Sequence, residues 1–258
     1  ISRIIDLDIC GIDIMTDDIT VPLNESGGAV LEVNAAPGFR MHLDPTGGLG
    51  RNVAEPVVDM LFPPGAPSRI PIIAITGTNG KTTTTRLTAH IMRTVGHKVG
   101  MTCSDGVYIM NRMLMKGDCT GPASAQFVLK DPLVDLAVLE TARGGLVRSG
   151  LGFEHCDVAI VTNVAADHLG LKDIHTLEEL AHVKSTVPRS VRQDGYAILN
   201  ADDELVMAMR KQCTSRIALF SLDENNRLIR QHCKLGGLAA IYENGFITIS
   251  KGEWKLRI

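Results

Sequence analysis

The chain has 258 residues, of which 45% are hydrophobic, enough to bury the core of one large domain or of one and a half smaller ones. Its formal net charge is −3, with both signs interspersed, so the composition gives no electrostatic footprint for nucleic acid. No apolar run reaches the length of a membrane span, and the first residues lack the pattern of a signal sequence. We therefore expect a globular, cytoplasmic protein that binds neither nucleic acid nor membrane.

Residues 1–62 predict a small β-rich unit. Apolar and polar side chains alternate at 9–15, a second strand is expected at 29–34, and a glycine-containing turn separates the two, as in a hairpin. A helix is expected at 53–61. Prolines and glycine then dominate residues 63–70, which predicts a linker and a domain boundary. Because the chain lacks an initiator Met and opens in an apolar alternating segment, we expect it to begin inside a domain and to be a fragment.

Residues 71–258 alternate apolar runs with longer helical stretches, the pattern of an α/β domain with a mostly parallel sheet. The expected strands are 71–76, 98–102, 134–140, 157–162, 195–199 and 216–220. The expected helices include 81–95, 122–130, 176–187 and 203–211. Short antiparallel strands are expected at the sheet edge at 238–242, 246–250 and 254–258. The chain stops within this pattern, so we expect this domain to be incomplete at its carboxyl end.

The segment 72–85 predicts a phosphate-binding loop, or P-loop, because a buried strand, two glycines and a helix start with one lysine follow one another. Glycines let backbone N–H groups curl round an anion, and the helix directs its positive end at the same oxygens. Lys81 suits the β- and γ-phosphates of a nucleotide, and the Thr82 hydroxyl suits Mg²⁺. The expected nucleotide-binding residues here are Gly77, Thr78, Asn79, Gly80, Lys81, Thr82 and Thr83. The alternative is an ordinary turn with a solvated lysine.

A second candidate site feature follows the strand 134–140. Open α/β sheets bind ligands beyond the carboxyl ends of their strands, and this strand delivers Glu140 to that edge, where it can join Thr82 around Mg²⁺. A surface acid is the weaker alternative. Arg143 and Arg148 flank a glycine pair and suit a carboxylate or a phosphate. A solvated loop explains these two arginines almost as well.

Two motifs resemble those of the Mur ligases, a family of ATP-dependent enzymes that form amide bonds. One is Gly-Thr-Asn-Gly-Lys-Thr at 77–82, and the other is Asn-x-x-x-Asp-His at 163–168. The resemblance implies that His168 helps to hold a second Mg²⁺ and takes part in catalysis, while Asn163 and Asp167 organise the nucleotide site. A structural histidine is the alternative for His168.

Lys184 lies where many Mur ligases have a lysine carbamylated by carbon dioxide, which bridges toward the metal. Only a neutral amine can be carbamylated, so burial that lowers the pKa of Lys184 would favour this modification. The resemblance thus implies a catalytic group of Lys81, His168 and Lys184. A helix-surface lysine explains Lys184 equally well.

The amino-terminal hairpin carries three more candidate metal ligands. Glu32 and Asn34 are two residues apart on one strand and share a face, and Asp13 on the partner strand can join them around Mg²⁺. These residues resemble the final metal-binding strands of ATP-grasp ligases. The alternative is the solvated polar face of a hairpin.

An ATP-grasp end joined through a proline-rich linker to a Mur-type site resembles the cyanophycin synthetase family, most closely at 32–42, 71–86 and 140–145. The resemblance implies an ADP-forming acid–amino-acid ligase that uses ATP and Mg²⁺. Its ATP-grasp part would add aspartate to the growing cyanophycin polymer, and its Mur-like part would add arginine to the aspartate side chain, both through acyl-phosphates. Aspartate, arginine and the polymer are the implied partners, and the full-length form is implied to be a homo-oligomer.

Three alternatives stay open: another Mur-type ligase, a paralogue that polymerises dipeptides, and a non-catalytic nucleotide-binding module. Residues 1–48 disfavour the first, and the presence of Lys81, Thr82, Glu140 and His168 favours a working ATP site. Most of an ATP-grasp module is absent from the sequence, so we expect the fragment alone to be inactive.

Overall fold

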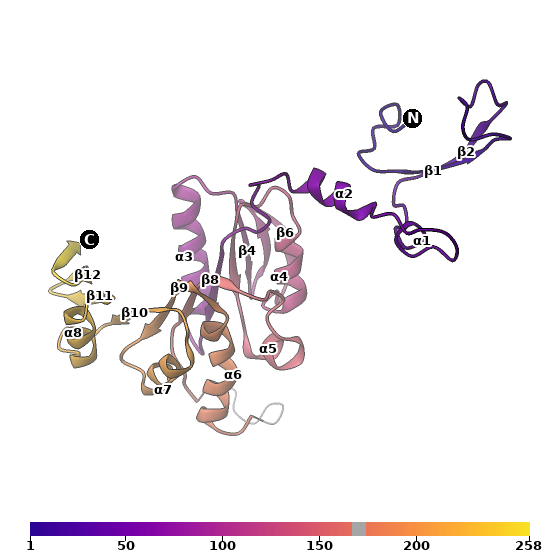
Figure 1. Cartoon of the computed structure of the whole chain (residues 1–258). Helices are drawn as coiled ribbons and strands as arrows, with labels where there is room; N and C mark the ends of the chain where they lie inside the picture. The colour runs from indigo at the N-terminus through magenta and orange to yellow at the C-terminus, as the bar shows by residue number, and fades with distance from the viewer. Residues whose placement is uncertain (167–173) are drawn as a thin grey trace. The chain divides into compact units, whose positions relative to one another are not determined.

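The computed structural model describes residues 1–166 and 174–258, which divide into two compact units, Ile1–Ser68 and Arg69–Ile258. Figure 1 shows the elements of both units. No helix in the described part of the chain is long and apolar enough to cross a membrane.

The first unit contains a two-stranded sheet and two short helices. Its elements are β1 (Gly11–Met15), β2 (Ala29–Asn34), α1 (Arg40–Leu43) and α2 (Ala54–Leu61). The strands β1 and β2 pair antiparallel with an irregularity after Asp13, so the expected hairpin is present. None of these four elements contains a fully buried residue.

The second unit is an α/β domain. Its strands are β3 (Ile72–Thr76), β4 (Val99–Cys103), β5 (Gly106–Ile109), β6 (Arg112–Lys116), β7 (Leu136–Glu140), β8 (Cys156–Val161), β9 (Val191–Asn200), β10 (Arg216–Ser221), β11 (Leu238–Glu243), β12 (Phe246–Lys251) and β13 (Trp254–Arg257). Its helices are α3 (Lys81–Thr94), α4 (Pro122–Leu129), α5 (Arg143–Ser149), α6 (Leu177–Arg189), α7 (Glu204–Ala208) and α8 (Arg227–Lys234), with a 3₁₀ turn at Met209–Gln212.

The described strands of this unit form one sheet in the order β13-β12-β11-β10-β9-β8-β3-β7-β4-β5-β6. The pairs from β11 through β3 to β4 are parallel, and the pairs at both edges are antiparallel. This confirms the mostly parallel sheet. The central strand β3 therefore has its carboxyl end between those of β7 and β8, which is where the P-loop begins.

Two buried clusters lie on opposite faces of the sheet. The smaller one packs Ala89 of α3 against Ile75, Val99 and Val138, and the larger one joins the other face to α4, α6, α7 and α8 through residues such as Val128 and Ile229. The strand β3 is buried along its whole length, as expected for a strand covered on both faces.

Some elements were absent from the sequence prediction, namely α1, α5, α8, β5 and β6. The helix α5 contains Gly144 and Gly145, which disfavour a helix. A Cβ on Gly145 would lie 2.9 Å from the Gly121 Cα atom, so close packing explains a glycine there. Every residue of β6 is exposed, so the strand lacks the apolar alternation that sequence analysis detects.

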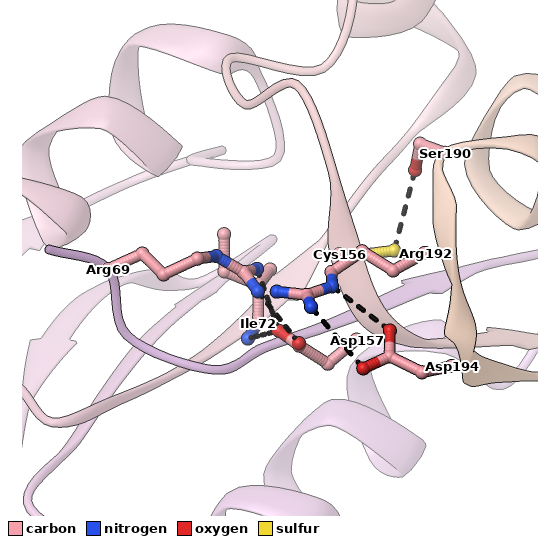
Figure 2. A network of polar contacts seen from close by, with 7 residues as sticks. All are labelled: Arg69, Ile72, Cys156, Asp157, Ser190, Arg192 and Asp194. Carbon is pink, nitrogen blue, oxygen red and sulfur yellow. Dashed lines mark hydrogen bonds and ion pairs between the residues drawn. The ribbon is translucent and has the colours of Figure 1, made fainter. Parts of the chain in front are cut away.

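A polar network ties β3 to β8 at their amino ends (Figure 2). Asp157 accepts two hydrogen bonds from the Arg69 guanidinium, both at 2.9 Å, and one from the backbone N–H of Ile72 at 2.8 Å. A carboxylate that satisfies a strand-end N–H and pairs with a forked guanidinium holds both strands in register. The neighbouring Cys156 thiol is buried, which raises its pKa to about 11, so this thiol is unreactive. The network lies at the opposite end of the strands from the P-loop and serves the fold.

Candidate functional site

The P-loop follows β3 and depends on two glycines with positive φ. Gly77 has a φ of 146°, and a Cβ there would lie 1.9 Å from the Thr162 Oγ1 atom. Gly80 has a φ of 81° and directly precedes α3. The Lys81 Nζ atom donates to the Thr78 carbonyl oxygen at 2.7 Å. This hydrogen bond folds the lysine back over the loop, within reach of an anion bound there.

The end of β8 supports the loop from the side. The Asn163 side chain accepts from the Asn79 N–H at 2.9 Å and donates to the Asn79 carbonyl oxygen at 3.1 Å. The Thr162 hydroxyl donates to the same carbonyl oxygen at 2.6 Å, and the Thr78 N–H donates to the Asn163 backbone oxygen at 2.8 Å. In the described structure Asn163 therefore holds the backbone of the phosphate loop in place.

Glu140 and Thr82 meet beyond the carboxyl ends of β7 and β3. Ile75 pairs with Glu140 in the sheet, and the Thr82 Oγ1 atom donates to Glu140 Oε2 at 2.9 Å. The Ser104 N–H donates to the same oxygen at 3.2 Å, and the Ser104 and Thr82 hydroxyls lie 3.0 Å apart. Glu140 is only 2% exposed, and this burial raises the pKa of its carboxyl. A buried carboxylate beside two hydroxyls is a suitable donor set for a hard cation such as Mg²⁺.

Lys184 lies on α6 and is 3% exposed. Its Nζ atom donates to the Gly77 carbonyl oxygen at 2.6 Å, so the side chain reaches the first residue of the P-loop. Burial, together with the positive charges of Lys81 and Arg143, lowers the pKa of Lys184 to about 7. A large share of this amine is therefore neutral near neutral pH, and the surface alternative considered for Lys184 is wrong.

Lys81, Thr82, Glu140 and Lys184 line one cavity of about 420 Å³. Its lining residues are Gly77, Thr78, Lys81, Thr82, Ser104, Asp118, Thr120, Glu140, Ala142, Arg143, Gly144, Leu180 and Lys184. A second cavity of about 370 Å³ shares Asp118, Thr120, Ala142 and Gly144 with it and also contains Arg148. The Arg148 Nε atom donates to the Gly144 carbonyl oxygen at 2.9 Å.

Sequence analysis missed Ser104, Asp118 and Thr120 as cavity residues. Ser104 directly follows β4, so the rule that directed attention to the ends of β7 and β8 also applied there. Asp118 Oδ1 accepts from the Thr120 N–H at 3.2 Å and from its hydroxyl at 2.7 Å. No sequence signal placed this turn beside the P-loop, because its position depends on how the edge strands β5 and β6 return to the sheet.

The cavity accounts for only some of the predicted site residues. Asp167 and His168 fall outside the described residues. Among the residues that the structure describes, no three His, Cys, Asp or Glu side chains are grouped so as to hold a metal. In the first unit Asp13 pairs directly with Glu32, and Asn34 pairs with Gly11. This register places the Asp13, Glu32 and Asn34 side chains on one face of the hairpin.

Comparison with known proteins gives consistent results. Residues 75–253 match the family model of the Mur ligase middle domain. The chain is 60% identical over all 258 residues to cyanophycin synthetase of Crocosphaera subtropica, and 57% identical to that of Synechocystis, and it covers 30% of each of these relatives. The chain therefore spans about a third of the length of the curated relatives it matches.

Solved structures support the fold. The structure of a UDP-N-acetylmuramoyl-L-alanyl-D-glutamate–2,6-diaminopimelate ligase superposes with a TM-score of 0.56 at 21% identity, covering 79% of this chain and 41% of that one. At this identity the likeness speaks for the fold alone.

Proposed function

The chain belongs to the Mur ligase family, and from that premise we propose that its second unit is the ATP site of an ADP-forming amino-acid ligase. Because the chain is 60% and 57% identical to two cyanophycin synthetases, we propose that the reaction joins arginine to an aspartate side chain of cyanophycin. ATP would phosphorylate the aspartate carboxylate, and the amine of arginine would attack the resulting acyl-phosphate and release phosphate.

The observation that carries this proposal is the 2.9 Å hydrogen bond between Thr82 and Glu140 in the cavity that the P-loop opens into. A bound cation would stabilise the buried Glu140 carboxylate, because a buried negative charge is costly unless a positive charge is paired with it. Glu140 and Thr82 would hold Mg²⁺, with Ser104 beside them. When bound, the ion would neutralise charge on the phosphate oxygens.

The remaining steps depend on the chain's own groups. Gly77 to Thr83 would form the phosphate loop, in which the N–H groups of Thr78 and Asn79 donate to Asn163 and those of Gly80 to Thr83 would be directed at the β- and γ-phosphates. Lys81 would turn from the Thr78 carbonyl to the transferred phosphate. Asn163 would keep the loop in its binding shape. Arg143 lines the first cavity, and Arg148 lines the second, which shares residues with the first. We propose that the two arginines hold the acceptor carboxylates.

Two further roles belong to the same proposal. The neutral form of Lys184 is the form that carbon dioxide modifies, and the low pKa of this buried amine supports the proposed carbamylation and a catalytic part for Lys184. His168 is proposed to hold a second Mg²⁺ with Asp167 beside it.

We also propose that residues 1–62 are the end of an ATP-grasp domain, that 63–70 form a linker, and that 71–258 form the Mur-like domain. Asp13, Glu32 and Asn34 would bind the Mg²⁺ of the aspartate-adding ATP site, which the rest of that domain would complete. We further propose that the protein is cytoplasmic and that its full-length form is a homo-oligomer.

The test uses this chain built into the full-length Crocosphaera relative in place of the matching stretch. Lys81→Ala should abolish ATP-dependent arginine incorporation, because it removes the positive charge proposed to stabilise the transferred phosphate. Lys211→Ala, which removes an exposed lysine, is the matched control and should leave incorporation unchanged. Arginine incorporation that survives in the Lys81→Ala protein would reject the proposed reaction.

A further inference from the structure

The second cavity, of about 370 Å³, adjoins the proposed ATP site. The two cavities share the lining residues Asp118, Thr120, Ala142 and Gly144, and the other residues of the second cavity come from the start of α4, with the residue before it, and from α5. The volume is within the range of about 300–1,000 Å³ that is usual for small-molecule sites. A ligand that places its reacting carboxylate in the first cavity can therefore extend into the second.

Asp118 gives the second cavity one negative group. Its Oδ1 atom accepts from the Thr120 N–H at 3.2 Å and from the Thr120 hydroxyl at 2.7 Å. Within the described part of the chain, no group donates to Oδ2 and no cationic side chain forms an ion pair with Asp118. The turn therefore fixes one carboxylate oxygen and leaves the other available to a ligand that carries a positive charge.

Arg148 and the start of α4 give the same cavity its groups for an anion. The Arg148 Nε atom donates to the Gly144 carbonyl oxygen at 2.9 Å, and its two terminal nitrogens donate to no described residue. The helix α4 begins at Pro122 without a capping side chain, and Ala123 and Ser124 of its first turn line the cavity. Because N–H groups in a first turn lack an intrahelical partner, they favour a nearby carboxylate.

We infer that the second cavity binds the arginine-bearing unit that precedes the acceptor aspartate in the polymer, with Asp118 on its guanidinium and Arg148 on its carboxylate. This inference rests on the proposed function and specifies the carboxylate that Arg148 holds. Arginine that is joined through its amine keeps a carboxylate and a guanidinium, so a finished unit carries both charges, and the cavity offers the opposite charge to each.

The position of the cavity agrees with this assignment. Consecutive residues of a chain are about 3.8 Å apart at their Cα atoms, so a site for the preceding unit must adjoin the site of the acceptor aspartate. The second cavity meets this condition because it shares residues with the first. Arginine addition would therefore favour acceptors whose preceding unit is already complete.

The first test measures ATP-dependent arginine addition by this chain built into the full-length Crocosphaera relative, without free aspartate. The synthetic acceptor ends in a free aspartate, and the aspartate before it carries either arginine or citrulline, whose side chain is neutral. Asp118→Asn keeps an oxygen for Thr120 but removes the charge. It should raise KM for the arginine acceptor about tenfold, or about 1.4 kcal/mol, leave kcat nearly unchanged, and barely affect KM for the citrulline acceptor. Glu253→Gln, an exposed control, should change neither KM.

Three results would overturn the inference while leaving the proposed function in place. One is that the wild type uses both acceptors equally well. Another is that Asp118→Asn raises KM equally for both. The third is that this variant lowers kcat and needs more Mg²⁺ with either acceptor, which would assign Asp118 to the metal site instead. Failure of the wild type to add arginine to any acceptor would reject the proposed function as well as the inference.

The second test examines the carboxylate contact. In a third acceptor, the aspartate before the free one carries agmatine, which is arginine without its carboxylate. Arg148→Gln should raise KM for the arginine acceptor about tenfold and leave KM for the agmatine acceptor nearly unchanged, because the agmatine acceptor already lacks the group that Arg148 binds. An equal increase for both acceptors, or no increase for either, would overturn the assignment of Arg148 to the preceding unit.

Discussion

At the scale of single residues, the proposed site depends on two titratable groups that are buried in the chain without a ligand. Glu140 is a carboxyl group whose burial raises its pKa, and Lys184 is an amine whose burial lowers its pKa. Burial disfavours the charged form of each group, so a neutral residue of the same shape would make the folded chain more stable. Perturbed groups that converge on one cavity are typical of functional sites.

Glu140→Gln should separate stability from binding. Gln keeps an oxygen that accepts from Thr82 and Ser104 but removes the buried charge, so we expect the unfolding free energy of the ligand-free chain to rise by about 1 kcal/mol. Binding of Mg²⁺ and a non-hydrolysable ATP analogue should weaken at least tenfold, or about 1.4 kcal/mol. Urea unfolding and calorimetric titration measure the two effects. Glu253→Gln, an exposed control, should change neither, and unaltered nucleotide affinity in Glu140→Gln would contradict the role given to this acid.

Lys184 should make stability depend on pH. Its pKa is about 7 in the folded chain and near 10.5 when unfolded, so between these values the unfolded chain binds more protons, and stability rises with pH by at most about 1.4 kcal/mol per unit. Lys184→Met should remove this rise, as measured by urea unfolding from pH 7 upward, whereas Lys211→Met should retain it. If the unfolding free energies of the wild type and of Lys184→Met change with pH in the same way, the lowered pKa of Lys184 is contradicted.

At the scale of elements, the P-loop packs directly against the end of β8. Gly77 lies so close to Thr162 that a Cβ would collide with it, and the Thr162 hydroxyl donates to the Asn79 carbonyl oxygen. A side chain at position 77 therefore cannot be accommodated without moving the residue that supports the loop.

Gly77→Ala should destabilise the chain by about 2 to 4 kcal/mol, since it combines a positive φ with a close contact. Gly96→Ala is the matched control, because Gly96 also has a positive φ, of 102°, but has open space around it, and we expect a cost of about 1 kcal/mol. Thermal unfolding of both variants gives the comparison. Equal costs would mean that contact with Thr162 contributes nothing.

Prediction from sequence succeeded for elements with strong local signals. The strand β3, the helix α3 and the P-loop between them combine buried β-branched residues, glycines and a helix start, and Glu140 ends an apolar run. Prediction failed for α5, where Gly144 and Gly145 oppose a helix that packing nevertheless stabilises. It also failed for Asp118 and Thr120, because tertiary structure alone brings that turn to the cavity.

At the scale of the whole molecule, the two units differ in how much of a site each contains. The second unit has two buried clusters and a cavity with the P-loop, Thr82 and Glu140 in contact. The first unit presents Asp13 opposite Glu32 on a hairpin without a buried residue. The described residues of the proposed arginine-adding site therefore contact one another around one cavity, whereas those of the proposed aspartate-adding site lie on a hairpin without a buried residue.

The most direct test is a crystal structure of the chain with Mg²⁺ and a non-hydrolysable ATP analogue. We predict that the β- and γ-phosphates lie on the N–H groups of residues 80–83, with Lys81 on the terminal phosphate and one Mg²⁺ contacted by Thr82 and Glu140. A nucleotide bound elsewhere, or a metal held without either of these two side chains, would contradict the account.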